Sequence, residues 1–409
     1  MLLRRIVMTL LLLTLSLHAA EVPETLFLSW EGNPCRTMTA QWLRGPGFGD
    51  RPDAKKPEEV RWRKAGGGEW QVLTTKTQPF PDPGKKGLPR WMVIKANWED
   101  LEPGAEYVFR FGDSAEMKFR TAPEKLVEGV TFVEGGDCDV TKRAEEMISL
   151  GCRQDPLFFS VGGDLAYGDW MSVAKEIAFL QQWSRSARTS AGRLVPLVAG
   201  IGNHEVMVGY VQDGATFEQM KAQAPFFYTL FGGLYRTAEP VALDFGDYLS
   251  MLLLDSGHLI PIKEQTGWLE KNLNLRKVVP WVFVSWHVMA FPSARSWNSQ
   301  KEIVDVRREW VPVLERSQVA AVFNHHDHNL QRVETEGKFG RKIQFFGNGA
   351  IGVEARPVQC QESKRLAKAW AEENYVNVIS IRRDGTTVRS LAPDGRELDR
   401  VDLETSRAR

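Results

Sequence analysis

Five short polar clusters carry the side chains of this sequence that could do chemistry. They are Gly136-Asp137, Gly163-Asp164-Leu-Ala-Tyr167, Gly202-Asn203-His204-Glu205, Trp286-His287 and His325-His326-Asp327-His328. Five of the seven histidines fall in these clusters, although strand-end caps and turns are the alternative explanation for such residues. Oxygen and nitrogen donors without thiolate suit Zn, Fe or Mn. Two such cations ~3.5–4 Å apart can hold a phosphate and activate a water, so the clusters predict a dinuclear metal site.

Apolar runs that end just before the clusters are the elements that must position them. These runs occupy residues 130–134, 157–161, 194–199, 249–254, 281–285 and 319–323. Nearly continuous hydrophobicity is typical of strands buried on both faces, so an α/β domain is predicted here. Ligands gather at the carboxyl ends of strands in such domains, where clusters distant in sequence could meet. We also expect a helix over residues 140–150 and strands near 344–347 and 376–391.

The chain before residue 124 has a different pattern. Short alternating stretches are separated by turns rich in Gly and Pro, near residues 25–30, 37–42, 60–63, 70–73, 91–94 and 107–111. They predict a β-sandwich of about a hundred residues, joined to the α/β domain by a linker over residues 124–129. A length of 409 residues also favours two domains.

The first twenty residues have the order of a secretory signal peptide. Arg4 and Arg5 precede a short apolar run, and small residues end the segment at Ala20. The apolar run is too short to span ~30 Å of hydrocarbon comfortably, although an uncleaved anchor is the alternative. We therefore expect export, periplasmic or secreted, with cleavage near Ala20 and no stable membrane insertion.

Composition is ordinary for a soluble globular protein, with 43% hydrophobic and 25% charged residues. Basic and acidic residues number 52 each, which gives no electrostatic reason to expect nucleic acid as a partner. The four cysteines are few for an exported chain of this size. Cys138 and Cys152 flank the expected helix, which at ~15 Å is too long for them to form a disulfide.

The five clusters resemble the signature of the calcineurin-like metallophosphoesterases, and Asp164-Leu-Ala-Tyr167 resembles the purple acid phosphatase subtype. The resemblance implies an N-terminal all-β sandwich of the fibronectin type III-like kind. It also implies an α/β metallophosphoesterase domain with two central β-sheets flanked by helices. The expected organisation is a signal peptide over residues 1–20, the sandwich over 21–123, the catalytic domain over 130–392 and a C-terminal tail over 393–409.

The resemblance also implies a role for each cluster. One metal would be held by Asp137, Tyr167 and His328, and a second by Asn203, His287 and His326, with Asp164 bridging the two. Tyr167 would favour Fe(III), and Fe(II), Zn(II) or Mn(II) would be the second metal. His204 would be the catalytic residue, contacting the phosphate or protonating the leaving oxygen. Asn203 and His325 are further candidates for substrate contact.

Three positions depart from the family's pattern. His325 stands where Gly is usual, and we expect it to face solvent, the alternatives being crowding of the second metal or a substrate contact. Asp139 stands where a small residue or His is usual, and we expect it to cap the helix that begins near Val140, the alternative being an altered metal preference. No second His follows His287, which leaves substrate contacts on that side open. None of these departures removes an expected metal ligand.

The predicted activity is acid phosphatase-like hydrolysis of phosphate monoesters by a metal-bound hydroxide, on a small-molecule or protein substrate. One alternative is a phosphodiesterase or nucleotidase with the same site, in which Trp170, Trp183, Trp297 and Arg295 would contact the substrate. We expect these aromatics to be packing residues and Arg295 to lie on a solvated face. A second alternative is a non-catalytic exported binding protein with a vestigial metal site.

Overall fold

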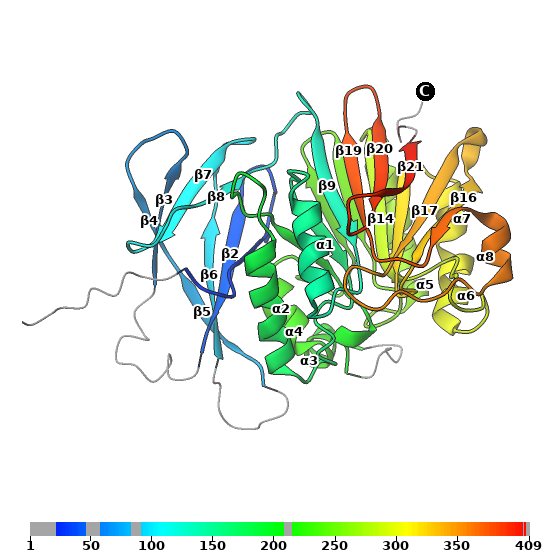
Figure 1. Cartoon of the computed structure of the whole chain (residues 1–409), viewed down its shortest axis with the longest axis horizontal. Coiled ribbons are helices and arrows are strands. Elements are labelled where there is room, and N and C mark those ends of the chain that lie inside the picture. The colour runs from blue at the N-terminus through cyan, green and yellow to red at the C-terminus, as the bar shows by residue number, and fades with distance from the viewer. Residues whose placement is uncertain (1–21, 46–57, 83–90, 208–214, 404, 406–409) are drawn as a thin grey trace, which may run out of the picture.

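The computed structural model describes residues 22–45, 58–82, 91–207, 215–403 and 405. The expected signal peptide over residues 1–20 lies outside the described residues. In the described part, a β-sandwich precedes a larger α/β domain, and the two pack side by side (Figure 1). The predicted fold class is therefore confirmed.

Two four-stranded antiparallel sheets form the sandwich, in the orders β1-β2-β6-β5 and β4-β3-β7-β8. Its strands are β1 (Phe27–Ser29), β2 (Met38–Arg44), β3 (Glu59–Lys64), β4 (Gln71–Thr74), β5 (Lys76–Phe80), β6 (Trp91–Trp98), β7 (Glu106–Phe111) and β8 (Met117–Arg120). Trp42, Trp98, Phe109 and Phe119 are fully buried in its core. Strand β5 was not predicted because it contains Pro79. It lies at a sheet edge, where a residue without an N–H group is tolerated.

Two mixed sheets form the α/β domain, with six strands in the order β11-β10-β9-β19-β20-β21 and seven in the order β12-β13-β14-β15-β17-β16-β18. Strands β9, β10 and β11 run parallel, as do β13, β14, β15 and β17. The first seven strands are β9 (Val130–Gly135), β10 (Phe159–Gly162), β11 (Leu197–Gly200), β12 (Val241–Phe245), β13 (Leu249–Leu253), β14 (Trp281–Val288) and β15 (Ala321–His325). The remaining six are β16 (Leu330–Glu336), β17 (Lys342–Asn348), β18 (Ala367–Ala371), β19 (Val376–Ile381), β20 (Thr386–Leu391) and β21 (Glu397–Leu403).

The expected C-terminal tail over residues 393–409 is wrong for the part that forms β21. This strand pairs antiparallel with β20, from Thr386 opposite Leu403 to Leu391 opposite Glu397. Its charged residues hid the strand from sequence reasoning. An edge strand tolerates such residues because one side of it borders solvent. The α/β domain therefore extends at least to Leu403.

Helices cover the outer faces of the two sheets, and phenylalanine rings fill the space between the sheets. The helices are α1 (Lys142–Cys152), α2 (Val173–Ser186), α3 (Phe217–Gln223), α4 (Pro225–Phe231), α5 (Ile262–Leu275), α6 (Lys301–Glu309), α7 (Val311–Glu315) and α8 (Gln361–Leu366), with 3₁₀ turns η1 (Asn203–Glu205) and η2 (Lys338–Gly340). Helices α1 and α2 pack on the six-stranded sheet, and α5, α6 and α7 pack on the seven-stranded sheet. Phe132 stacks on Phe158, and Phe158 on Phe245, with centroids 4.9 Å and 4.6 Å apart. Among the described residues, no helix combines the length and apolar character needed to cross a membrane.

Helix α1 is capped by a different residue from the one expected. Thr141 is its N-cap, and the side-chain oxygen of Thr141 accepts a hydrogen bond from the Ala144 backbone N–H at 3.0 Å. The expectation that Asp139 caps this helix is therefore wrong. Asp139 instead accepts a bond from its neighbour Val140 and forms an ion pair with Lys175 of α2 at 2.5 Å. The residue thus ties the loop after β9 to α2.

Aromatic contacts join the sandwich to the α/β domain. Trp30 of the sandwich is 2% exposed and makes edge contacts with Phe158 and Phe245, with centroids 6.1 Å and 5.6 Å apart. Phe80 of β5 stacks on Phe226 of α4 at 5.2 Å. The sandwich core thus continues into the layer between the two large sheets. We expect the two domains to unfold together because they share this apolar cluster.

Replacing Trp30 with alanine tests this shared core. The variant should lose about 3–5 kcal/mol of unfolding free energy, because a fully buried indole is removed from both domains. Trp70 is the matched control, since it lies partly exposed on the sandwich with Arg63 and Arg110 over its ring. Trp70→Ala should cost about 1 kcal/mol or less. Equal costs in chemical denaturation would contradict a core shared between the domains.

Candidate metal centre

The polar clusters converge where the carboxyl ends of the two parallel strand sets face each other. Asp137 follows β9, the Asp164–Tyr167 segment follows β10, and Asn203 begins η1 after β11. From the other sheet, His287 lies near the end of β14, where the pairing with β15 shifts register, and His326 and His328 follow β15. Backbone bonds join the first two loops, from Asp137 N–H to Gly163 and from Cys138 N–H to Asp164.

Asp137, Tyr167 and His328 form one group of donors. The Tyr167 hydroxyl lies 2.9 Å from Asp137 Oδ1 and 3.1 Å from His328 Nε2. His328 Nε2 in turn lies 3.0 Å from Asp137 Oδ1. Adjacent ligands of an octahedral ion with bonds of ~2.1 Å are about 3 Å apart. The three atoms therefore already have the mutual spacing of ligands on one face of a cation.

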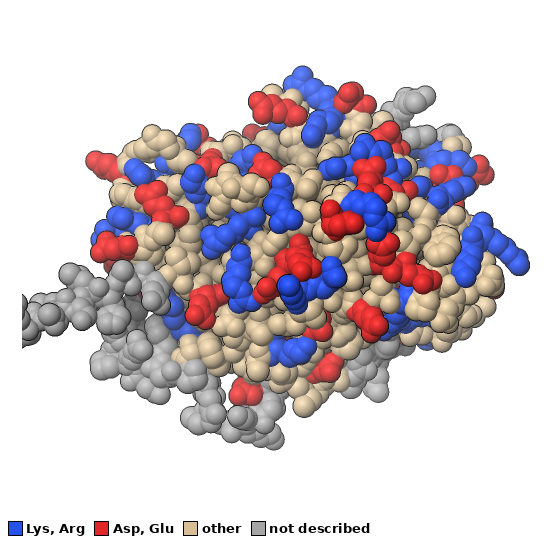
Figure 2. All heavy atoms as spheres, in the orientation of Figure 1, with Lys and Arg blue, Asp and Glu red and all other residues tan. Residues whose placement is uncertain are grey.

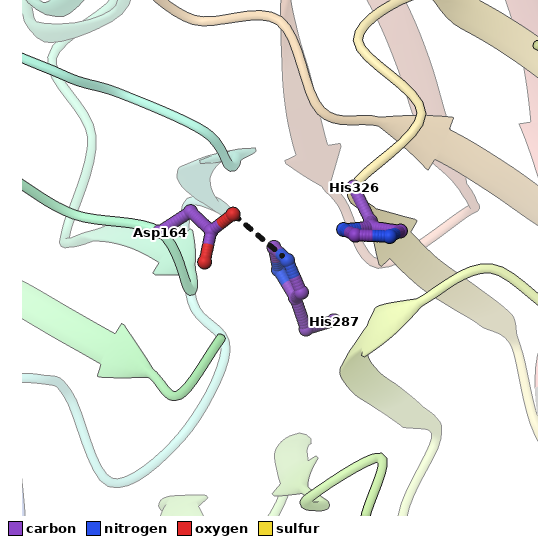
Figure 3. Close-up of side chains that lie close together, drawn as sticks. All are labelled: Asp164, His287 and His326. Carbon is purple, nitrogen blue, oxygen red and sulfur yellow. Dashed lines mark ion pairs between the residues drawn. The ribbon is translucent and has the colours of Figure 1, made fainter. Parts of the chain in front are cut away.

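Asp164, His287 and His326 form a second group, each with a possible ligand atom within 4.8 Å of the others. In Figure 3 the Asp164 carboxylate points toward His287, and His326 faces them from the opposite side. His287 Nε2 lies 3.2 Å from Asp164 Oδ2, while its Nδ1 donates to the Gly162 carbonyl at 3.0 Å. That bond orients the ring so that Nε2 faces the site.

Two buried atoms at the site make no well-formed hydrogen bond among the described residues. They are Asn203 Oδ1 and His287 Nε2, and the latter faces the Asp164 carboxylate. A buried polar atom without a partner is costly, so such atoms commonly mark a ligand or ion site. Both are atoms that a metal ion would bind. The donors present therefore fit two cations, and oxygen and imidazole donors suit Fe, Zn or Mn.

The electrostatics of the site also favour cations. Asp137 and Asp164 are almost completely buried, and burial alone would raise their pKa values. The positive charges of the neighbouring histidines, with His287 the largest contributor, together outweigh burial and lower the pKa of both carboxyls. Burial likewise lowers the pKa of His287, but Asp164 and Asp137 raise it to about 9. The site therefore holds two ionised carboxylates in an enclosed place and stabilises positive charge between them.

The backbone of the site is strained. Positive φ angles occur at five of the seven predicted ligands, namely Asp137, Asp164, Tyr167, His326 and His328, with values of 48° to 68°. Residues other than glycine rarely adopt this conformation, which costs of order 1–3 kcal/mol each. Gly202 leaves room for Asp164, because a Cβ atom there would lie 2.2 Å from Asp164 Oδ1. The fold thus holds these side chains in costly positions that bring the donors together.

His204 lies beside the donors and retains an exposed side. Its side chain is 30% exposed, its ring is 4.1 Å from the Tyr167 ring, and Nε2 lies 3.9 Å from Asp164 Oδ2. Nδ1 lies 2.5 Å from a carboxylate oxygen of Asp169. Burial lowers the pKa of His204, but the charges of Asp164 and Asp169 raise it above its ordinary value overall. The residue can therefore carry a proton at the mouth of the site.

Sequence reasoning missed three residues that support the site. Glu205 accepts bonds from the backbone N–H groups of Asp164, Leu165 and Gly202 at 2.7–2.8 Å, which anchors two loops at once. Asp169 orients His204, as described above. Asp327 accepts from the N–H groups of Ser293 and Ala294. Glu205 and Asp327 lie inside the predicted clusters, so their position in the sequence was an available signal.

Arg295 is not on a solvated face, contrary to the expectation from sequence. Its side chain is 18% exposed, and its Nε lies 2.7 Å from the buried Asp327 carboxylate. One Nη atom contacts His326 Nε2 and the other donates to the His326 carbonyl. The loop after β14 therefore places a guanidinium group beside the second group of donors.

The tryptophans considered as substrate contacts are placed differently from one another. Trp183 is 1% exposed and packs against Phe159 and Phe179, so it belongs to the core. Trp297 donates to Ser363 and lies under Arg307. The backbone of Trp170 adjoins the site, because the Trp170 backbone N–H donates to the His204 carbonyl.

His325 is buried, so the expectation that it faces solvent is wrong, and no path to substrate is open to it. It is 0% exposed and lies beneath the metal centre. Its Nε2 is 3.1 Å from a carboxylate oxygen of the equally buried Glu134, and Nδ1 donates to the Asn348 carbonyl at 2.8 Å. A Cβ atom on Gly162 would lie 1.8 Å from its Nε2, so the ring fits only because that strand ends in glycine.

The segment that contains the site matches the model of a known protein family. The family model described as calcineurin-like phosphoesterase matches residues 134–330, a range that includes every predicted ligand. The segment over residues 134–330, which contains the site, is therefore a calcineurin-like phosphoesterase domain.

Within this class the chain is similar to purple acid phosphatases. A protein of Arabidopsis thaliana named "Probable purple acid phosphatase 20" is 25% identical over 240 residues, which cover 57% of this chain and 53% of that protein. An uncharacterised protein of Mycobacterium tuberculosis is 26% identical over 197 residues, covering 43% of this chain and 35% of that protein. The match thus spans about half of the plant relative and about a third of the mycobacterial one.

Solved structures share the whole architecture. A purple acid phosphatase from yellow lupin (Lupinus luteus) seeds has a TM-score of 0.73 at 15% identity, covering 93% of this chain and 74% of that one. The structure titled PhoD has a TM-score of 0.63 at 13% identity, covering 94% and 91%. At these identities the likeness concerns the fold.

Removing His325 tests the support beneath the site. His325→Ala leaves the Glu134 carboxyl buried without its partner, and we expect it to lower the unfolding free energy by about 3–5 kcal/mol. The double variant Glu134→Gln, His325→Ala removes the stranded carboxyl as well, so it should be more stable than His325→Ala alone. Chemical denaturation measures both. A His325→Ala variant as stable as the parent chain would contradict this role.

Proposed function

We propose that this protein is a metal-dependent, acid phosphatase-like hydrolase of phosphate monoesters. The observation that carries the proposal is the convergence of two donor groups at one edge of the fold, around two ionised carboxylates. Membership of the metallophosphoesterases supports a phosphoester as the substrate. Similarity to purple acid phosphatases supports the monoester preference.

We assign one metal to Asp137, Tyr167 and His328, and a second to Asn203, His287 and His326, with Asp164 shared by both. The mutual spacing of about 3 Å in the first group supports this division, as do the buried atoms Asn203 Oδ1 and His287 Nε2, which make no well-formed hydrogen bond among the described residues. A phenolate donor favours Fe(III) at the first position, with Fe(II), Zn(II) or Mn(II) at the second. Such a pair of cations neutralises phosphoryl oxygens and acidifies a water molecule.

We assign to His204 the transfer of a proton to the leaving oxygen. Its Nε2 faces Asp164 while Nδ1 is held by Asp169, so the ring is oriented with one nitrogen toward the site. Asp164 and Asp169 both favour the protonated form of the ring. A proton donor of this kind typically accelerates ester cleavage 10²–10⁴-fold.

We assign to Arg295 the binding of a phosphoryl oxygen. A guanidinium group fixed by a buried carboxylate is well suited to this task, because little side-chain entropy is lost on binding. Arg295 lies on the side of His287 where the family's second His is missing. Arg295 would provide the positively charged group that a second histidine provides at this place in the family.

We also propose that the protein acts after export from the cytoplasm. The basic start, the short apolar run and the small residues before Glu21 support this.

A substrate panel tests the proposed function. Purified protein should hydrolyse phosphate monoesters faster than matched diesters, lose activity on chelation and regain it when Fe and Zn are restored. Faster diester hydrolysis would favour the diesterase alternative, in which Trp170, whose backbone adjoins His204, is a candidate to contact a base. Full activity after complete metal removal would refute the proposal.

His204→Ala should lower kcat by about 10²–10⁴-fold for alkyl phosphates. The loss should be much smaller for p-nitrophenyl phosphate, whose leaving oxygen needs no proton. Metal content should be unchanged, because His204 is not among the assigned ligands. Steady-state kinetics on both esters, with metal analysis of the same samples, measure these effects. Equal losses on the two esters would contradict proton transfer by His204.

Arg295→Gln should raise KM for phosphate monoesters by about tenfold or more, because a charge-assisted hydrogen bond contributes about 1.5–3 kcal/mol. Arg295→Lys should recover part of the loss. Arg308→Gln is the control, since Arg308 is 59% exposed and pairs with Asp305 and Glu309 of its own helix α6. An unchanged KM in Arg295→Gln with normal metal content would show that Arg295 does not contact the substrate.

A further inference from the structure

A cavity of about 1290 Å³ opens at the edge of the α/β domain opposite to the metal centre. It is lined by the linker at Lys125 and Leu126, by segments that precede β13, β14, β15 and β17, and by the turn between β19 and β20. This turn lies at the top of Figure 1. The predicted metal ligands follow the opposite ends of the same parallel strands. Strand β14 has eight residues, so the cavity and the metals are separated by roughly 26 Å.

The cavity concentrates positive charge in a chain whose formal net charge is zero. Among the described residues, six basic residues line it, against the acids Asp247 and Asp384: they are Lys125, Arg316, Lys338, Arg341, Arg382 and Arg383. Arg316 forms an ion pair with Glu270, so its charge is already compensated. Along the upper edge in Figure 2, Lys and Arg side chains lie next to Asp and Glu side chains. The excess of cations raises the local concentration of anions.

Two of the arginines are held in place by the linker. Arg382 lies across Gly129, where a Cβ atom would be 2.7 Å from its guanidinium. Its Nη1 donates to the Ile381 carbonyl at 3.1 Å, and Arg383 Nε donates to the Leu126 carbonyl at 3.2 Å. Carbonyl oxygens orient a guanidinium without neutralising it. Within the described part of the chain, neither arginine forms an ion pair, so their charges remain available to a ligand.

We propose that this cavity is a binding site for a compact polyanion that bears several phosphate or sulfate groups. Guanidinium groups bind such groups through paired hydrogen bonds. The volume exceeds what a single phosphate needs and lies above the roughly 300–1,000 Å³ of pockets for small molecules, so a ligand with several anionic groups has room. Tyr248, Trp281 and Leu403 provide walls that can contact the carbon skeleton of a ligand. The acids at the rim and the neutral chain favour a compact ligand over nucleic acid, which selects broad basic surfaces.

Calorimetric titration of the metal-loaded protein with sucrose octasulfate tests the site, because this probe is not a phosphoester. The variant Arg382→Glu, Arg383→Glu reverses two charges on an exposed turn. The control Arg396→Glu, Arg400→Glu makes the same change of formal charge outside the cavity, at residues that pair with Glu373 and Glu397. We expect the affinity to fall by about tenfold or more in the first variant and by less than about twofold in the control.

Three results would overturn the proposal. They are absence of binding by the parent protein, equal affinity of the parent and the cavity variant, and equal losses in the two variants. Equal affinity would place the probe elsewhere, and equal losses would indicate diffuse attraction by net charge. Phosphatase activity should be unchanged in the cavity variant, which shows that it folds and separates this site from the metal centre.

Discussion

Two ionised carboxylates buried side by side are the constraint on which the rest of this structure depends. Asp137 and Asp164 end neighbouring parallel strands, and their loops are joined by backbone hydrogen bonds. Such an arrangement is unstable unless positive charge lies between the carboxylates, and the surrounding imidazoles supply part of it. The remaining donors, a phenol and an amide oxygen, suit cations. The left-handed backbone at Asp137 and Asp164 indicates that the fold accepts strain to hold the pair.

The packing beneath the site holds the strained backbone in place. Phenylalanine rings fix the two sheets against each other, and Trp30 extends this packing into the sandwich. Directly under the loops, the Glu134–His325 pair fills the space left by Gly162. Beside the donors, the buried Glu205 accepts hydrogen bonds from three backbone N–H groups, and the buried Asp327 holds Arg295. The donors are therefore carried by a stiff frame, which is what preorganised catalysis requires.

The sequence was sufficient to predict the fold class and the convergence of the clusters, because apolar runs followed by polar residues have a direct physical meaning in α/β sheets. The sequence could not predict that His325 is buried, because this burial depends on contacts with Gly162 and Glu134 in other strands. Strand β21 was missed because its charged residues hide an edge strand. Capping of α1 by Thr141 instead of Asp139 was decided by the left-handed backbone at Asp139. Each failure lies where contacts distant in sequence, or backbone strain, override a local pattern.

The visible absorption spectrum of the metal-loaded protein and of Tyr167→Phe, with metal content measured on the same samples, tests the central claim most directly. The account predicts about two metals per chain, iron among them, and a broad visible band that disappears in Tyr167→Phe while most of the metal remains. A chain that binds no metal, or a band that persists unchanged without the Tyr167 hydroxyl, would contradict it.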